Sequence, residues 1–314
     1  MRSENDSSRQ KLAAQPRTLL AQVVGISLPT ALGNSFEYLP VCFAMAIVGH
    51  LDEGKHGLDA LSLGRAWFNF TALAPSFGLL SGLRTLCPQA VGAGKPELCR
   101  LYTQRACVVL FAASPLCVSL QFVCGPALRY MGHTAELADA AQAYTLRLIP
   151  MYFGVGFMTI LQRVYQAHDL VWSNMVICGV VCAAAPLLQW GLVRGAGLGV
   201  LGAAWAASAF NGLYCFFQVP HLCYLGYGYL FSPSAGALDP AGFREYLAIS
   251  SWGCLQTVLE WWVLEAVIFA ISMIDEAEVQ GVIAASAIFG NMQAVFIMAW
   301  VGLLVAAASL VGKS

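Results

Sequence analysis

Eight stretches of the chain are apolar enough, and long enough, to cross a lipid bilayer. A transmembrane helix needs about 20 mostly apolar residues, because the hydrocarbon core is about 30 Å thick and a helix rises about 1.5 Å per residue. The chain is 59% hydrophobic and only 11% charged, against about 25% charged residues in soluble domains. These features predict an all-α polytopic membrane protein with helices near residues 18–48, 61–83, 106–125, 138–162, 171–193, 200–225, 246–274 and 281–310.

The longest connection, residues 226–243, divides these helices into two groups. It combines Gly-Tyr-Gly-Tyr, Ser-Pro-Ser and Asp-Pro-Ala-Gly, and turn-forming residues at that density indicate a linker. We therefore expect a six-helix lobe over residues 18–225, a cytoplasmic linker over 226–243, and a partial second lobe with two helices over 244–314. Residues 1–17 are polar and lack the apolar core of a secretory signal peptide, so they are expected to form a cytoplasmic tail.

The basic residues predict the orientation, because cytoplasmic loops carry an excess of Lys and Arg. With the N-terminus inside, eleven basic residues fall on the cytoplasmic side and five on the other. The five are Lys55, Arg65, Arg129, Arg147 and Arg194. The bilayer is thus an expected partner, in the plasma membrane or an organelle membrane such as that of the vacuole.

Three glutamates, Glu37, Glu260 and Glu265, lie inside predicted membrane helices. A charge there costs several kcal/mol unless it is paired, hydrated or protonated, so an ionisable residue inside a span marks a functional site by default. A carboxyl group shielded from water can bind a proton from one side and release it when a cation arrives. The alternatives are a hydrogen bond between helices and, for Glu37, a pair with Asn34 one helical turn away.

A weak internal repeat relates the two expected lobes. Phe36-Glu37-Tyr38 precedes an acidic pair as Leu259-Glu260-Trp261 does, at an offset of 223 residues, and the Gly-Leu-Leu segments at 78–80 and 302–304 match at an offset of 224. Repeats of this kind are typical of secondary transporters, whose binding sites lie near the repeat interface. Chance matching of apolar sequence is the alternative.

Several classes of function are disfavoured by what the sequence contains. The formal net charge of −1 offers no basic stripe for nucleic acid. Most of the eleven cysteines lie in apolar segments, where a thiol packs as a small apolar group. The five histidines lack metal-ligand spacing, and no nucleophile arrangement typical of hydrolases occurs. We therefore expect no enzyme activity, no metal and no cofactor.

Six short segments of the chain match the pattern of a known transporter family. They read Val-Gly-His-Leu at 48–51, Thr-Leu-Cys-Pro-Gln-Ala-Val-Gly-Ala at 85–93, Tyr-Thr-Gln-Arg at 102–105, Leu-Gln-Arg at 161–163 with Gln-Ala at 166–167, Gly-Leu-Gly at 197–199 with Gly-Ala-Ala at 202–204, and Glu-Trp-Trp-Val-Leu-Glu at 260–265. In these segments and in their order, the sequence resembles the multidrug and toxic compound extrusion (MATE) family, in its eukaryotic form. The resemblance implies an antiporter of two six-helix lobes that exports organic cations and other xenobiotics in exchange for protons or sodium ions.

The chain departs from the family pattern in three places. Pro88 replaces a usual glycine and Val91 a usual aromatic residue, so the turn after the second helix is expected to be altered. Ala285 stands where animal members often carry a glutamate. The chain stops at Ser314, about four helices short of a full second lobe, so it is also expected to be C-terminally truncated.

The candidate site for ions and substrate comprises Glu260, Glu265, Glu37, Trp261, Trp262 and Tyr38. The aromatic side chains can stack on flat cations or pack against lipid and neighbouring helices. Gln89, Gln104 and Arg105 are candidate gate residues at the cytoplasmic helix ends, where such side chains otherwise satisfy carbonyl groups or reach for water. The alternatives to an efflux antiporter are a lipid or oligosaccharide flippase, a truncated protein with a structural or regulatory role, and a seven-helix receptor.

Overall fold

The computed structural model describes residues 16–51, 54–273 and 282–313, and within these ranges it contains helices and no β-strand. Most of the predicted tail and both acidic pairs, Asp52-Glu53 and Asp275-Glu276, lie outside the described residues. The elements are α2 (Pro16–Gly49), α3 (Gly54–Phe68), η1 (Asn69–Leu73), α4 (Ala74–Leu79), α5 (Leu83–Gly92), α6 (Pro96–Ser119), η2 (Leu120–Val123), α7 (Cys124–Tyr130), α8 (Ala135–Arg147), α9 (Ile149–Ala167), α10 (Val171–Trp190), η3 (Gly191–Gly195), α11 (Gly199–Tyr224), η4 (Tyr227–Phe231), η5 (Ala235–Leu238), α12 (Pro240–Ser272) and α14 (Val282–Lys313).

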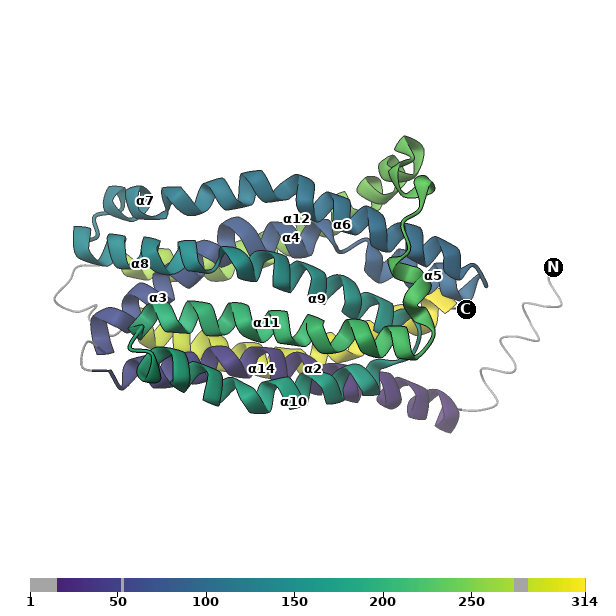
Figure 1. Ribbon diagram of the computed structural model, residues 1–314, viewed down its shortest axis with the longest axis horizontal. Helices are drawn as coiled ribbons and strands as arrows, with labels where there is room; N and C mark the ends of the chain where they lie inside the picture. The colour runs from purple at the N-terminus through teal and green to yellow at the C-terminus, as the bar shows by residue number, and fades with distance from the viewer. Residues whose placement is uncertain (1–15, 52–53, 274–281, 314) are drawn as a thin grey trace.

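The helices run side by side along the long axis of the molecule (Figure 1). Within the described residues, five continuous helical stretches are long and apolar enough to cross a membrane. A sixth span is the pair α8 and α9, which is bent by 44°. The passage α3–η1–α4 and helix α14 run alongside these six, so the described chain makes eight passes. The prediction of an all-helical, multi-pass membrane protein with about eight helices is confirmed.

The start of α12 differs from the sequence-based boundary. The linker was expected to extend to residue 243, whereas α12 begins at Pro240. The side chain of Asp239 accepts a hydrogen bond of 2.9 Å from the Gly242 backbone N–H, and Pro240 occupies the first helical position. An aspartate cap followed by proline is a helix-starting signal, so the Asp-Pro pair ends the linker and begins the next helix.

The first six passes enclose the main hydrophobic core. Its largest buried side chains include Phe68 from the second pass, Tyr152 from α9 and Tyr214 from α11. The hydroxyl group of Tyr152 donates a hydrogen bond of 3.1 Å to the Leu110 backbone oxygen of α6, which satisfies a polar atom that has no access to water. The core therefore joins the first six passes, and Tyr246 of α12 also contributes to it.

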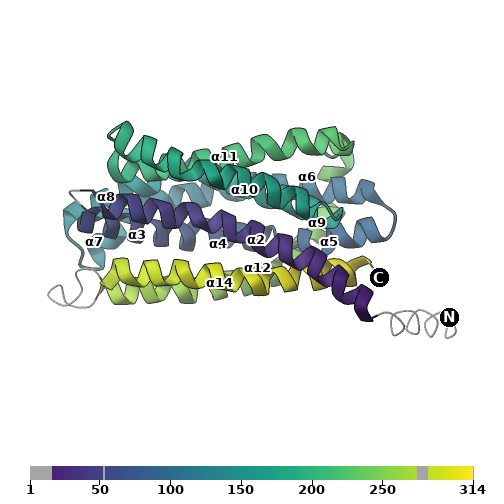
Figure 2. The same ribbon diagram turned by 90° about the horizontal axis from the view of Figure 1, so that it is seen from below.

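The last two helices lie as a layer against one side of this bundle (Figure 2). Helix α14 packs along α2, and α12 packs along α4 and the end of α3. The internal repeat pairs α2 with α12 and pairs the second pass with α14. The two contacts are therefore equivalents of each other, because each joins the first helix of one group to the second helix of the other.

Two glycines show this equivalence at the level of single atoms. A methyl group added to Gly78 would lie 2.7 Å from Cα of Cys254, and one added to Gly302 would lie 2.9 Å from Cβ of Ala31. Gly78 and Gly302 are repeat partners at the offset of 224, and Ala31 and Cys254 are related by the offset of 223. Small residues let membrane helices approach closely. The repeat therefore corresponds to one packing contact that is used twice.

Candidate functional site

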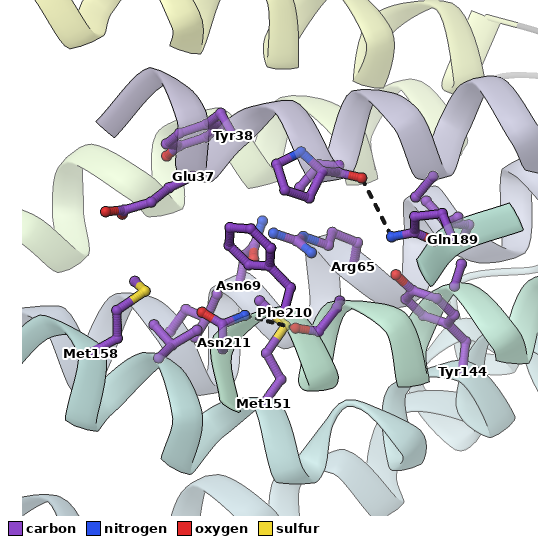
Figure 3. A pocket seen from close by; sticks show the side chains of 18 of the residues that line it. Glu37, Tyr38, Arg65, Asn69, Tyr144, Met151, Met158, Gln189, Phe210 and Asn211 are labelled. Carbon is purple, nitrogen blue, oxygen red and sulfur yellow. Dashed lines mark hydrogen bonds between the residues drawn. The ribbon is translucent and has the colours of Figure 1, made fainter. Parts of the chain in front are cut away.

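A small cavity lies between α2, the second pass, α9 and α11, and Gln189 of α10 and Trp261 of α12 complete its lining (Figure 3). Its volume is about 100 Å³, which has room for several water molecules. Pockets that enclose drug-sized molecules begin at roughly 300 Å³, so a large ligand would require the walls to separate. The polar lining residues are Glu37, Tyr38, Arg65, Asn69, Tyr144, Gln189 and Asn211.

Arg65 and Asn69 project into this cavity from the same stretch of helix (Figure 3). They are four residues apart, and residues at that spacing share one face of a helix. The distribution of basic residues predicts that Arg65 lies at the outer side of the membrane. The structure places it within α3, with its side chain half-buried at the cavity wall. The reason is that α3 begins at Gly54, so Arg65 lies three helical turns inside the passage.

Glu265 lies behind Asn69 and joins α12 to the second pass. The Asn69 side-chain N–H group donates a hydrogen bond of 2.8 Å to Oε1 of Glu265. Glu265 is only 7% exposed. Its electrostatic neighbours include Arg65, and Tyr38 lies within the field of both groups. The carboxylate of α12 therefore belongs to the same polar cluster as the cavity, although it comes from the other lobe.

Three acceptor atoms around the cavity have no hydrogen-bond donor among the described residues. They are Oε2 of Glu265, Oδ1 of Asn69 and Oε1 of Gln189, and all three are buried. Buried acceptors are normally satisfied, and an unsatisfied one costs about 1–3 kcal/mol. Since the unpaired groups are acceptors, the missing partner is a donor or a cation: a water molecule, a proton, a metal ion or an ammonium group.

Glu37, on α2, also lines the cavity. Its Oε1 accepts a hydrogen bond from the side chain of Gln162 in α9, so its partner is on another helix and is not Asn34. The guanidinium group of Arg163 lies within electrostatic range of the carboxylate. Glu37 therefore sits between the cavity and a basic group on α9.

The predicted aromatic residues take two positions. Trp261 lines the cavity and packs against Phe77 with ring centroids 5.2 Å apart. Trp262 stacks on Phe70 at 4.5 Å, and its indole N–H donates a hydrogen bond of 2.9 Å to the Phe70 backbone oxygen. The ring of Tyr38 is at the cavity wall. Tyr38 and Trp261 are thus available to a ligand, while Trp262 fastens α12 to η1.

Glu260 is the one predicted glutamate whose side chain is exposed. It lies on α12, five residues before Glu265, and that spacing turns the two side chains by about 140° around the helix. Arg84, near the start of α5, lies within electrostatic range of it. The structure therefore does not bring Glu260 into the cavity of the first six passes.

The candidate gate residues lie away from the cavity. Gln89 is exposed on α5. Gln104 donates a hydrogen bond of 2.6 Å to the Ser232 backbone oxygen and accepts one of 3.1 Å from the Ser234 N–H. Arg105 donates to the Gly236 oxygen at 3.1 Å and is buried. Gln104 and Arg105 thus hold the linker between the lobes by forming hydrogen bonds with its backbone groups.

Sequence reasoning overlooked Arg65, Asn69 and Gln189 as members of the site. The indication was present for Arg65, because it falls inside the predicted span of residues 61–83, where an ionisable side chain is a functional-site indicator. Asn69 could have been found from it by the i, i+4 rule. Gln189 has no comparable indication, since its position depends on how α10 packs against α2.

Comparison with known proteins identifies the family. The MatE family model matches residues 29–187, which is half of the chain. DETOXIFICATION 52 of Arabidopsis thaliana is 29% identical over 80% of this chain and 48% of its own length. DETOXIFICATION 16 of the same plant is 30% identical over 77% of this chain and 50% of its own length. The chain therefore spans about half the length of the curated relatives that it matches.

Solved structures agree on the fold. The crystal structure of the eukaryotic MATE transporter AtDTX14 superimposes with a TM-score of 0.77 at 23% identity, over 94% of this chain and 69% of that one. The eight passes thus have the arrangement of a MATE transporter over most of the chain. Together with the family match, this shows that the chain belongs to the MatE family of integral, multi-pass membrane proteins.

Proposed function

We propose that the chain acts as a secondary active transporter that exports organic cations and other xenobiotics in exchange for protons or sodium ions. The observation that carries the proposal is the buried carboxylate of Glu265, which is held by Asn69 beside a cavity and leaves one oxygen without a donor. Membership of the MatE family supports a transport function, because AtDTX14 is a MATE transporter.

The exchange follows from the requirement that Glu265 be neutralised. A carboxylate inside a membrane is stable when it is protonated or paired with a cation. A proton on Oε2 and a cation beside Oε2 satisfy the same atom, so the two compete. Binding of the cation releases the proton, and protonation on the other side of the membrane releases the cation.

The cavity supplies the remaining contacts that an organic cation needs. Tyr38, Trp261 and Phe210 line it, and aromatic faces attract cations by about 0.5–2 kcal/mol each. The cavity is about 100 Å³ in this state, so the helices around it must move apart to admit a larger compound. Because α12 and α14 form a separate layer against the bundle, a shift of that layer would open the side next to Trp261.

A transport measurement tests the proposal. The chain is expressed in cells, and everted vesicles are assayed for accumulation of tetraphenylphosphonium when their interior is acidified. We expect uptake by the wild type, and loss of it in Glu265→Gln, which keeps the Asn69 hydrogen bond but cannot exchange a proton. Glu37→Gln and Glu260→Gln tell whether either of the other carboxyl groups takes part. Absence of uptake by correctly inserted wild-type protein would reject transport by this chain.

A further inference from the structure

A groove lies on the outer surface of the six-pass bundle, where the linker with η4 and η5 meets α6, α9 and α11 (Figure 1). Its volume is about 830 Å³, and its lining, within the described residues, shares no member with the cavity that Glu37 lines. Val108, Phe231 and Leu238 line the groove and are themselves exposed. The groove is therefore open to the surroundings of the bundle, which in a membrane are lipid.

The groove covers the half of the bundle that is next to the linker. Its lining residues run from Pro150 to Leu161 on α9 and from Ser208 to Val219 on α11, which is about 16 Å along each helix at a rise of about 1.5 Å per residue. Ser208 lies near the middle of α11. Since the hydrocarbon core is about 30 Å thick, the groove has the length and the position of an acyl chain in one leaflet.

The lining of the groove is suited to a chain of methylene groups. It is mostly apolar, and none of the described residues that form it is charged. Gln104, its longest polar side chain, is already engaged with the backbone of Ser232 and Ser234. Gly212 leaves open space, since a methyl group added there would meet no atom within 4 Å. An acyl chain can therefore lie along α11 without displacing a side chain at that position.

Arg100 provides a positive charge at the linker end of the groove. It is four residues before Gln104 on α6, and side chains at that spacing share one face of a helix. Its ion pair with Glu97 is partly exposed, and such pairs contribute little. Its Nε–H group is buried and has no acceptor among the described residues. Arg100 also lies within electrostatic range of Tyr229, so an anionic group bound there would be next to the linker.

We propose that the groove binds an anionic phospholipid of the leaflet next to the linker, with an acyl chain along α9 and α11 and the phosphate on Arg100. A phosphate supplies the acceptor oxygens that a guanidinium group binds best, and basic residues at a membrane surface attract anionic lipids. Leu230, Phe231 and Leu238 line the groove from the linker, so the lipid contacts the bundle and the linker together. The site is separate from the proposed transport function, and it makes the order of the segment before α12 depend on the lipid.

Photo-cross-linking with lipids tests the proposal. The purified full chain is reconstituted in phosphatidylcholine vesicles that contain a minor fraction of a phospholipid with a diazirine group on its acyl chain. The headgroup of this probe is either phosphatidylglycerol, which is anionic, or phosphatidylcholine, which is neutral overall. Peptide mapping after illumination shows which residues have reacted. We expect labelling to concentrate in residues 103–108, 150–161 and 208–219, and to be about fivefold stronger with the anionic probe, as expected for one basic residue.

Substitutions separate the acyl chain from the headgroup. Gly212→Phe should fill the groove and remove most of the labelling. Gly290→Phe is the matched control, because Gly290 is also an exposed helical glycine with no atom within 4 Å, and it lies on α14. Arg100→Gln should keep the labelling and lose the preference for phosphatidylglycerol. Glu97→Gln should increase that preference, because it removes the negative charge beside Arg100.

The linker gives an independent readout. Phosphatidylglycerol should slow the proteolysis of residues 226–239 in the wild type and in Gly290→Phe, and should have no such effect in Gly212→Phe. Arg129→Gln should behave as the wild type in both assays, because its ion pair with Asp139 joins α7 to α8, away from the groove.

Three results would overturn the proposal. The first is labelling spread evenly around the bundle, or none in the groove, as when a second copy of the chain covers it. The second is equal labelling of the groove by the two probes. Both are read from the wild type, so they hold even if Gly212→Phe does not fold. The third is groove labelling that folded Gly212→Phe leaves unchanged.

Discussion

Asn69 donates a hydrogen bond of 2.8 Å to Glu265, across 196 residues of sequence. One residue belongs to the second pass of the six-pass bundle, and the other belongs to α12 of the adjoining layer. The bond therefore connects the cavity of the first lobe to a carboxylate of the second group. Protonation of Glu265 removes the charge that strengthens this bond, so a change of protonation state acts directly on the contact between the two groups.

Replacement of Asn69 by alanine should destabilise the protein by about 1–3 kcal/mol, because Glu265 would lose its donor while staying buried. The measurement is the thermal unfolding midpoint in detergent. Asn211→Ala is the control, since Asn211 also lines the cavity but bonds to the Ala207 oxygen one turn earlier in its own helix. Equal effects of the two substitutions would show that the hydrogen bond to Glu265 contributes nothing specific.

Valine at Gly78 or at Gly302 should weaken the contact between the bundle and its outer layer. Each added side chain would meet atoms of the facing helix well inside normal contact distance, and overpacking of this kind costs about 1–3 kcal/mol. Gly25→Val provides the control, because nothing lies within 4 Å of that position. The two substitutions should have similar effects, since the repeat makes the two contacts equivalent, and a neutral result for either one would argue against that equivalence.

Arg105→Ala should release the linker that precedes α12. Arg105 donates to the carbonyl groups of Gly236 and Ala237, and hydrogen bonds from a charged donor contribute about 1.5–3 kcal/mol each. Limited proteolysis should therefore cut residues 226–239 faster in the variant. Arg129→Ala should leave the rate unchanged, because the ion pair of Arg129 with Asp139 is exposed on both sides and joins α7 to α8. A linker that stays resistant in Arg105→Ala would assign its order to other contacts.

The orientation can be tested at Cys223, the one cysteine of the chain that is exposed. It lies in the last turn of α11, next to the linker, which the distribution of basic residues places in the cytoplasm. A membrane-impermeant maleimide should label Cys223 in everted vesicles and not in intact cells, and Cys223→Ser should lose the labelling. Labelling of intact cells would invert the predicted topology.

The sequence was sufficient to predict the helices, because long and mostly apolar segments can be recognised without knowledge of their packing. It also predicted the repeat. In the structure, the repeat partners Gly78 and Gly302 make equivalent close contacts with the facing helices. The start of α12 at Pro240 differs from the predicted boundary, because Asp239 and Pro240 suit a turn as well as they suit a helix cap. Local residue chemistry decided that boundary, and hydrophobicity could not.

The site was only partly predictable. The sequence selected Glu37, Glu265, Tyr38 and Trp261, each of which lies at or beside the cavity. It could not distinguish Glu265 from Glu260, because both lie on one helix and the difference is which face α12 turns towards η1. Arg65 could be identified from the sequence, because it lies inside a predicted membrane span. The contribution of Gln189 could not, because it depends on packing between distant helices.

Release of protons on cation binding tests the exchange at Glu265 most directly. Tetraphenylphosphonium has no proton to lose, so any acidification after its addition to the purified 314-residue chain, in weakly buffered and slightly acidic detergent solution, comes from the protein. We predict that the wild type releases about one proton for each cation bound, as expected for competition at one carboxyl group, and that Glu265→Gln releases none. Release of the same amount by Glu265→Gln, with the cation bound as in the wild type, would contradict the proposed mechanism.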